Sequence, residues 1–361
     1  MDFSEYGHPS DEWTAYVAAH PEAEARRMPA SGTPRDFQTK TNATRAASAA
    51  EAFARSGLAS AVRLVDHTFP ARDGSQIQAR SYHPKKANDG PLLPGFVYYH
   101  GGGFVFGTID TEMYTCASFA AKLGIIVVHI CYRHTPEHTY PKAFHDGIDG
   151  LIWTADNAEA LGIDAANIVT GGFSAGGGVA VAATAAIAGL IRDEPTKVKF
   201  TVKGMVLGLP HVLHPHAFPY ELFASREATS PVQCADAPVL PKDMVELFTE
   251  LMQAGERCGD ELLNVPLLSH DKLSKLPKTT FLVAGRDPLR DGSLLFAEKL
   301  RQVGVPVRVH MFPGLPHGLR RFKGLWSADR FGQVFEQGLQ WAMKSTSKGE
   351  DAWIIETPPT S

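Results

Sequence analysis

The sequence predicts an α/β protein in which a mostly parallel sheet of eight strands is flanked by helices. Short apolar segments recur along the chain and, after the third of them, alternate with segments of helical character. This alternation is typical of parallel sheets, because parallel strands need a crossover connection that is usually a helix. With 361 residues, of which 44 % are hydrophobic and 20 % charged, the chain is also long enough to bury a large core.

Eight strand candidates are rich in β-branched and aromatic residues and are bounded by glycine, proline or polar residues. They are Val62–Phe69, Ile77–His83, Pro94–Tyr99, Gly124–Tyr132, Asn167–Phe173, Lys203–Leu209, Lys278–Arg286 and Pro306–Phe312. Ligands of such sheets bind beyond the carboxyl ends of the strands. The residues that directly follow a strand are therefore the first candidates for function.

Two segments lie outside this alternation. Residues 1–50 contain stretches that predict helices, among them an alanine-rich stretch from Ala43 to Ala54. Residues 210–268 form a long insertion between two strand candidates. We expect residues 51–209 and 269–361 to form the two parts of one integrated core domain.

Ser174 is the candidate nucleophile. It lies in Gly172-Phe173-Ser174-Ala175-Gly176, between a strand candidate and a helix predicted over Ala175–Leu190. A serine at this junction needs small residues two positions before and after it, because larger side chains would collide with neighbouring backbone. Gly172 and Gly176 meet this requirement. The adjoining helix N-terminus favours negative charge on a bound substrate oxygen.

A glycine run earlier in the chain supplies the second half of an acyl-transfer site. His100-Gly101-Gly102-Gly103 directly follows the strand candidate Pro94–Tyr99. Glycine N–H groups approach a developing oxyanion closely, and one such donor contributes about 3 kcal/mol to transition-state stabilisation. We expect the N–H groups of Gly102, Gly103 and Ala175 to form the oxyanion hole. A phosphate loop is the alternative, but neither G-x-G-x-x-G nor a G-K-[ST] ending is present.

A serine nucleophile needs a base, and the base needs an orienting carboxylate. Asp287 follows the strand candidate Lys278–Arg286, and His317 lies in the loop after Pro306–Phe312. The order Ser174, Asp287, His317 accompanies a G-x-S-x-G nucleophile turn and differs from the chymotrypsin-like and subtilisin-like orders. We therefore expect Asp287 to be the carboxylate and His317 the general base.

Rival acidic and histidine residues have simpler explanations. Asp291 competes with Asp287, but it lies at the start of a helix predicted from about Ser293 to Val303, and we expect it to be the N-cap of that helix. Three histidines that lie within strand, helix or apolar segments are expected to be packed or solvated: His129, His145 and His310.

Together these motifs resemble the hormone-sensitive-lipase-like family of α/β-hydrolases, which includes bacterial esterases, arylacetamide-deacetylase-like enzymes and plant carboxylesterases. Tyr132-Arg133-His134-Thr135-Pro136-Glu137-His138-Thr139-Tyr140-Pro141 is similar to that family's Y-R-x-x-P-E-x-x-x-P stretch. The shared features run from about Phe96 to Gly318 in the family's order. The resemblance implies the α/β-hydrolase fold and a serine-dependent carboxylic-ester hydrolase, carboxylesterase-like or lipase-like, whose catalytic triad is Ser174, Asp287 and His317.

The resemblance also implies a helical cap over the serine, formed by residues 1–50 and by the insertion at 210–268. We expect the cap to set substrate choice. Aromatic residues near the site and the cap indicate an apolar pocket for an ester of small to medium size, although ordinary core packing is the alternative for each of them. The expected pocket residues are Phe104, Phe173 and Tyr220.

Three features depart from the common pattern of the resembled family. Phe173 occupies the position where an acidic residue usually precedes the nucleophile, and Gly178 the position where asparagine is common. The loop Pro210–His216 is dense in histidine, but Pro215 interrupts any helical face that would gather the imidazoles into a metal site. We expect neither a metal nor an organic cofactor.

The composition excludes several other classes of protein. A net charge of −4 argues against a nucleic-acid partner. We see no signal peptide and no apolar run long enough to span a membrane, so we expect a cytoplasmic protein. A small-molecule ester is the expected partner, and a homodimer is compatible with the sequence. The cysteines lack close pairs or metal-site spacing and are expected to be free thiols: Cys116, Cys131, Cys234 and Cys258.

Two other functions fit the same fold. Some enzymes of the resembled family use the pocket for dehydration, cyclisation or acyl transfer on specialised metabolites. A non-catalytic small-molecule receptor is a weaker alternative, because receptors of this fold lose the base whereas Asp287 and His317 are both present here. Fold alone does not decide between these functions.

Overall fold

A computed structural model of the chain describes residues 1–25, 32–85, 90–194, 200–345 and 350–359. Within them the strands form one sheet in the order β1-β2-β4-β3-β5-β6-β7-β8-β9. The pairs β1/β2 and β2/β4 are antiparallel, and every other neighbouring pair is parallel. The strands are β1 Val62–Pro70, β2 Gln76–Pro84, β3 Leu93–Tyr99, β4 Ile126–Cys131, β5 Ile163–Phe173, β6 Val202–Gly208, β7 Thr279–Arg286, β8 Val307–Pro316 and β9 Ala352–Ile355.

The sheet corrects one expectation, because it contains nine strands in the described residues and not eight. Each predicted strand overlaps one of β1 to β8, and β9 is added in parallel at the edge beside β8. Hydrogen bonds hold both ends of β9: the Val307 N–H donates to Asp351 Oδ1 at 2.7 Å, and the Glu356 N–H donates to Met311 O at 2.7 Å. A strand of four residues is too short for alternation to reveal it.

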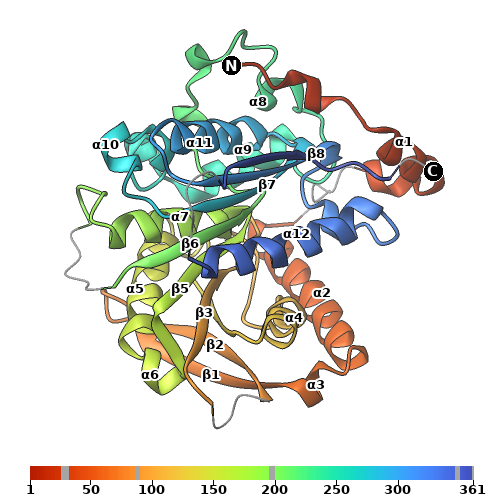
Figure 1. Cartoon of the computed structure of the whole chain (residues 1–361). Coiled ribbons are helices and arrows are strands. Elements are labelled where there is room, and N and C mark those ends of the chain that lie inside the picture. Colours follow the sequence, from red (N-terminus) through yellow and green to blue (C-terminus); the bar gives the residue numbers. More distant parts are fainter. Residues whose placement is uncertain (26–31, 86–89, 195–199, 346–349, 360–361) are drawn as a thin grey trace.

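Helices cover both faces of the sheet (Figure 1). Alternate residues of β3 point to opposite faces: Val97 and Tyr99 join the core under α5, α7 and α11, whereas Phe96 and Tyr98 join the core under α4 and α12. The helices are α1 Asp11–Ala19, α2 Pro34–Arg55, α3 Leu58–Ala61, α4 Met113–Leu123, α5 Lys142–Asp156, α6 Ala158–Leu161, α7 Ala175–Ile187, α8 Ser230–Gln233, α9 Lys242–Met252, α10 His270–Leu273, α11 Arg290–Gln302 and α12 Trp326–Met343.

Helix α7 is buried along its whole length. Its residues are mainly alanine, glycine and valine, so the helix lies close to β3, β5 and β6 on one side and to α5 on the other. A helix that is apolar all round belongs in a core. Because α7 is fixed on several sides, Ser174 at its N-terminal end has a rigid support.

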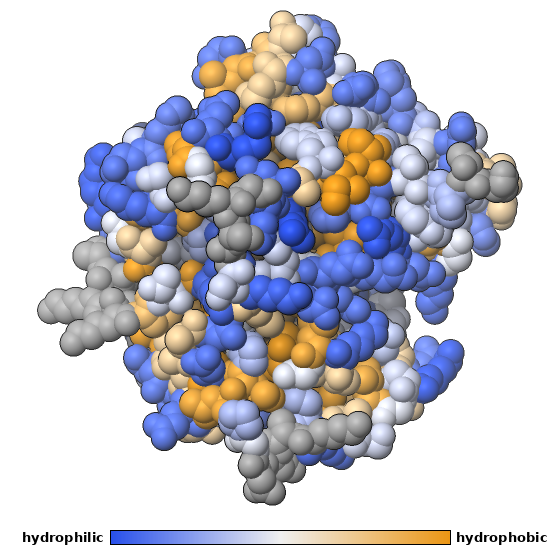
Figure 2. Space-filling view, in the orientation of Figure 1, coloured by the Kyte–Doolittle hydropathy of each residue, from blue (hydrophilic) through white to orange (hydrophobic). Residues whose placement is uncertain are grey.

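The two segments outside the alternation contain helices, as expected. In the first, α2 packs against α4, and the short helix Ser4–Gly7 lies against β7 and β8. In the second, α9 is the longest helix within residues 210–268. None of the helices in the described parts of the chain has the length and hydropathy needed to cross a membrane. The face shown in Figure 2 is mostly hydrophilic, with small separate apolar patches.

Candidate active site

Ser174 lies in a sharp turn between β5 and α7. Its φ of 54° and ψ of −122° are unusual for a residue with a side chain and store strain. Its N–H donates to Gly208 O at 2.9 Å, which ties the turn to β6. A Cβ atom on either Gly172 or Gly176 would lie 2.1 Å from Tyr99 O. The small residues on both sides of Ser174 are therefore required by the approach of β3.

The structure brings Ser174, His317 and Asp287 together in one hydrogen-bonded chain. His317 Nε2 lies 3.0 Å from Ser174 Oγ, and His317 Nδ1 lies 2.7 Å from Asp287 Oδ2. His317 is 8 % exposed and Asp287 1 % exposed. Because a carboxylate only accepts, the bond to Asp287 requires a proton on Nδ1, and Nε2 of the neutral ring is then free to accept the serine proton.

The second oxygen of Asp287 is also occupied, because Oδ1 accepts the Leu289 N–H at 2.9 Å. Asp291 faces a different set of partners. Its carboxylate accepts the Ser230 N–H at 2.6 Å and the Arg290 Nε–H at 2.6 Å. The expectation that Asp291 is an N-cap was wrong: α11 begins at Arg290, so Asp291 is already inside the first turn and anchors the insertion through Ser230.

The glycine run passes close to Ser174. A Cβ atom on Gly101 would lie 3.4 Å from Ser174 Cβ and 2.8 Å from Phe173 O. Gly102, with a φ of +147°, and Gly103, with a φ of +63°, adopt backbone that favours glycine. The carbonyl of Gly102 accepts the N–H groups of Val105 and Phe106 at 3.0 and 2.8 Å. The loop thus presents its main chain beside Ser174.

Helix α2 holds this loop from outside through three polar side chains. Gln38, Asn42 and Arg45 lie on one face of the helix, and each bonds the main chain of the loop or of the neighbouring segment. Gln38 Nε2 donates to the carbonyls of Val105 at 2.8 Å and Thr135 at 2.9 Å. Asn42 Oδ1 accepts the Gly107 N–H at 2.8 Å. Arg45 Nη2 donates to Gly101 O at 3.2 Å.

Arg45 also joins a buried charge network behind the loop. Glu112, 7 % exposed, accepts from Arg45 Nη2 at 2.9 Å, from the Tyr98 hydroxyl at 3.1 Å and from Arg320 Nη2 at 3.3 Å. Burial works to raise the pKa of Glu112, but Arg320 and Arg45 outweigh it and lower the pKa to about 2. The network links α2, α4 and the segment after His317.

Phe173 points to the face of the sheet that α4 and α12 cover, opposite the cavity beside Ser174. Its ring packs against Tyr98, Phe331 and Phe335, and the Arg320 guanidinium lies 4.0 Å above its centroid. A cation over an aromatic face is an attractive contact. Phe173 therefore connects the nucleophile turn to the segment that follows His317, through apolar and cation–π contacts in place of a carboxylate.

His100 and the three histidines that were expected to be packed or solvated occupy packed or ion-paired positions. The Tyr132 hydroxyl donates to His100 O at 2.6 Å, and the His100 ring stacks on Tyr132 with centroids 4.5 Å apart. Burial lowers the pKa of His100 to about 3. His129 is fully buried, and within the described residues neither of its ring nitrogens has a hydrogen-bond partner. His145 and His310 pair with Glu194 and Glu356, each at 2.7 Å.

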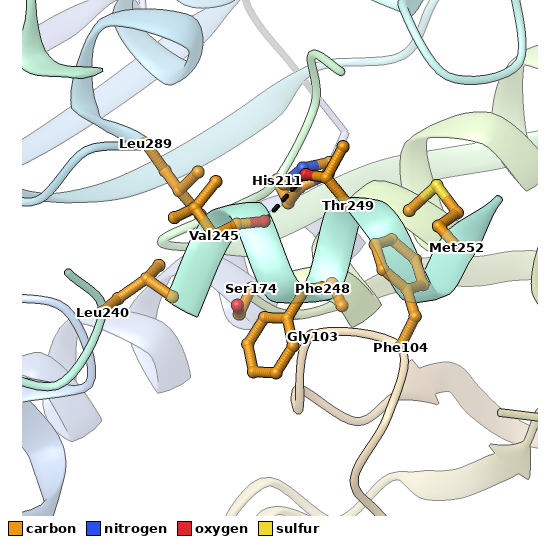
Figure 3. A pocket seen from close by; sticks show the side chains of 11 residues that line it. Gly103, Phe104, Ser174, His211, Leu240, Val245, Phe248, Thr249, Met252 and Leu289 are labelled. Atoms are coloured by element: carbon orange, nitrogen blue, oxygen red, sulfur yellow. Dashed lines mark hydrogen bonds between the residues drawn. The ribbon is translucent and has the colours of Figure 1, made fainter. Parts of the chain in front are cut away.

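A cavity of about 30 Å³ lies beside Ser174 under helix α9 (Figure 3). Its walls are mostly apolar, and α9 contributes four of the side chains. The lining residues are Gly103, Phe104, Ser174, Ala175, His211, Leu240, Val245, Phe248, Thr249, Met252 and Leu289.

Of the three expected pocket residues, the structure places only Phe104 in this cavity. Phe173 faces the other core, and Tyr220 packs against Phe218 and the Arg226 guanidinium. Sequence reasoning missed the side chains of α9 and His211. The α9 residues that line the cavity are spaced as on one face of a helix: Val245, Phe248, Thr249 and Met252. This spacing predicts an apolar helix face but not what that face covers.

The histidine-dense loop separates into two parts. His211 faces the cavity, whereas the rings of His214 and His216 pack together with centroids 5.1 Å apart. Among the residues that the structure describes, no group of three or more histidine, cysteine or acidic side chains is arranged to hold a metal ion. The cysteines described here are free thiols.

Comparisons with known proteins agree with this architecture. The alpha/beta hydrolase fold family matches residues 96–321. Esterase LipI of Mycobacterium tuberculosis is 34 % identical over 268 residues, which cover 73 % of this chain and 77 % of that protein. Versiconal hemiacetal acetate esterase of Dothistroma septosporum is 31 % identical over 79 % of this chain and 83 % of its own.

Solved structures show the same likeness. Vibralactone cyclase superposes with a TM-score of 0.81 at 27 % identity, covering 94 % of this chain and 96 % of its own. A bacterial heroin esterase superposes with a TM-score of 0.76 at 25 % identity, covering 94 % and 99 %. With the family match over more than half its length, the chain belongs to the hormone-sensitive-lipase-like family of α/β-hydrolases, and its relatives include carboxylesterases and lipases.

Proposed function

We propose that the protein is a serine carboxylesterase that cleaves esters of small to medium size through an acyl-enzyme intermediate. The observation that carries the proposal is the continuous contact from Asp287 Oδ2 through His317 to Ser174 Oγ, at 2.7 and 3.0 Å. A serine with a positioned imidazole and an orienting carboxylate is the arrangement that acyl transfer requires. The esterase names of several relatives support the same reaction class.

In the first half of the reaction, Ser174 Oγ attacks the ester carbonyl and gives its proton to His317 Nε2. The N–H groups of Gly102, Gly103 and Ala175 hold the oxyanion. The tetrahedral intermediate collapses, the bond between the carbonyl carbon and the alcohol oxygen breaks, and the leaving alcohol takes the proton from His317. Asp287 stabilises the imidazolium throughout.

In the second half, His317 takes a proton from water as the water oxygen attacks the acyl-enzyme. Collapse of the second intermediate breaks the bond to Ser174 Oγ, which recovers its proton from His317, and the carboxylic acid leaves. The cavity beside Ser174 then accepts a short acyl group. Residues 1–50 and 210–268 act as the cap in this proposal, because α2 supports the oxyanion loop and α9 covers the cavity.

The test compares wild type with Ser174→Ala on p-nitrophenyl esters from acetate to palmitate. We expect rapid turnover of the short esters by wild type and a loss of at least about 10³-fold in kcat for the variant, since the nucleophile is absent. Stoichiometric labelling of wild type by diethyl p-nitrophenyl phosphate provides an independent readout. Equal turnover by the two proteins, or a folded wild type that neither turns over any ester nor is labelled, would refute the proposal.

A second candidate reaction is intramolecular acyl transfer, in which a hydroxyl of the bound acyl group takes the place of water and forms a lactone. The likeness to vibralactone cyclase favours this candidate. Mass spectrometry of the products distinguishes the two reactions, since hydrolysis adds one oxygen from solvent to the acid and cyclisation adds none.

A further inference from the structure

His211 lies beside Ser174, and the proposed mechanism gives it no role. The main chain of His211 is fixed to the nucleophile turn, because its N–H donates to Ser174 O at 3.0 Å. A Cβ atom on Gly178 would lie 2.1 Å from His211 O, so α7 and this loop are in close contact. The main chain of His211 is therefore fixed relative to Ser174.

The imidazole of His211 forms part of the cavity wall. Its ring meets the Phe104 ring edge to face, with centroids 5.5 Å apart. Figure 3 shows the ring next to helix α9, among the side chains that line the same cavity as Ser174. His211 thus places two nitrogen atoms in surroundings that are otherwise mostly apolar.

Within the described ranges, the one hydrogen bond of the His211 ring is to the main chain of His211 itself, which leaves the other ring nitrogen for a ligand. Thr249, the other polar lining side chain apart from the nucleophile, already donates its hydroxyl to Val245 O at 2.8 Å. A polar group without a partner in an apolar site costs free energy, which a ligand with a matching polar atom recovers. Burial lowers the pKa of His211 to about 4, so at neutral pH the ring offers one donor and one acceptor.

The position of His317 indicates which part of the ester meets His211. The leaving alcohol takes a proton from His317, so the alcohol lies on the His317 side of Ser174. His317 is not among the residues that line the cavity. The cavity, with His211 in its wall, is therefore the space left for the acyl group.

We propose that His211 is a specificity-determining residue that hydrogen bonds an oxygen atom carried by the acyl group. The preferred substrates are then esters of short hydroxy or oxo acids, because neutral imidazole accepts from a hydroxyl and donates to a carbonyl. This inference rests on the proposed esterase function and narrows its substrate class.

The experiment compares kcat/KM for ethyl 3-hydroxybutanoate, as each enantiomer, with kcat/KM for ethyl 3-methylbutanoate, which has the same shape without the hydroxyl. For wild type we expect a ratio of about 10 for the better enantiomer, which corresponds to one neutral hydrogen bond. His211→Phe should lower the ratio to about 1, and His211→Asn, which keeps a donor and an acceptor, should restore part of it. His216→Phe is the matched control, because it makes the same change at a histidine of this loop that does not line the cavity, and it should keep the wild-type ratio.

The substrate ratio separates specificity from structure, because a packing defect lowers both rates together. Labelling of Ser174 by diethyl p-nitrophenyl phosphate shows that each variant retains a folded site. A wild-type ratio near 1, or a ratio that His211→Phe leaves unchanged, overturns the role of His211 while ester hydrolysis stands. If wild type hydrolyses none of these esters or the p-nitrophenyl series, the esterase proposal itself fails.

Discussion

Two helices meet the loop of residues 101–107, which carries two of the proposed oxyanion donors and is called the oxyanion loop, and they hold it by different forces. Helix α2 uses hydrogen bonds, which reach the loop main chain from Gln38, Asn42 and Arg45. Helix α9 uses an aromatic ring, because Phe248 lies so close to Gly103 that a Cβ atom there would be 2.3 Å from the ring. Hydrogen bonds to carbonyl and N–H groups fix where the main chain lies, whereas an apolar contact mainly fills space.

We propose a division of roles between the two helices of the cap, in which α2 positions the loop and α9 shapes the cavity. Changes on the polar face of α2 should disturb the position of the proposed oxyanion donors, and should therefore lower kcat and the free energy of unfolding. Changes on the apolar face of α9 should alter the size of the cavity, and therefore the choice of acyl group.

The largest expected effect is that of Arg45→Met. The substitution removes the bond to Gly101 O and one of the two cations beside buried Glu112, which leaves that carboxylate poorly compensated. Breaking a buried ion pair from one side costs about 3 kcal/mol of unfolding free energy. We also expect kcat for p-nitrophenyl acetate to fall about tenfold. A misaligned oxyanion donor loses only part of the transition-state stabilisation that the donor provides when it is well aligned.

Arg55→Met is the matched control on the same helix. Arg55 pairs with Glu51, and both side chains are mostly exposed. Exposed pairs contribute less than about 1 kcal/mol. Urea unfolding and steady-state kinetics compare the two variants. Equal losses of unfolding free energy and of kcat in both would show that the contacts of Arg45 with the loop matter no more than an exposed ion pair.

The second prediction concerns pH. The pKa of Glu112 is lowered to about 2 from its ordinary value of 4.5, so its ion pairs stabilise the fold above pH 4.5. That contribution is lost as the pH falls from 4.5 to 2, because the carboxylate takes up a proton on unfolding throughout that window. Glu112→Gln lacks this titration. The difference in unfolding free energy between wild type and Glu112→Gln should therefore shrink by about 3 kcal/mol between pH 5 and pH 2.

Urea titrations at closely spaced pH values measure this difference. A gap between the two proteins that stays constant across the acid range would mean that Glu112 is not an ionised partner of Arg45 and Arg320. Since both cations come from segments that border the oxyanion loop and His317, such a result would also weaken the proposed division between the two helices.

The residues of the nucleophile turn and their strands were predictable because their constraints are local. A serine between a strand and a helix needs glycine at fixed offsets, and Gly172 and Gly176 display that need in the sequence itself. Likewise Asp287 and His317 each follow a strand with a strong apolar pattern. The short edge strand β9 lacks such a pattern, which is why it was missed.

The α2 side chains that hold the loop and the surroundings of Phe173 were not predictable, because their contacts join segments far apart in the chain. Gln38, Asn42 and Arg45 form a polar helix face, and in a sequence such a face indicates exposure to water. Phe173 was expected in the pocket as an aromatic residue beside the nucleophile. Its actual side of β5 follows from alternation, which places it opposite the cavity and beneath Arg320, a partner that sequence spacing does not reveal.

Among the substitutions that alter contacts with the loop, the one in α9 has the smallest expected effect on the free energy of unfolding, and it is also the sharpest test of the division. Phe248→Ala removes a half-buried ring that closes the cavity above Gly103, so it should cost about 1 kcal/mol of unfolding free energy. The enlarged cavity should raise kcat/KM for p-nitrophenyl octanoate about tenfold relative to butyrate, because additional methylene groups become buried at about 0.8 kcal/mol each. The oxyanion loop keeps its bonds to α2 in this variant, so kcat for acetate should fall less than with Arg45→Met. If Phe248→Ala loses acetate turnover as severely as Arg45→Met, the ring also positions the proposed oxyanion donors. The size of the cavity and the position of the loop then do not depend on separate helices.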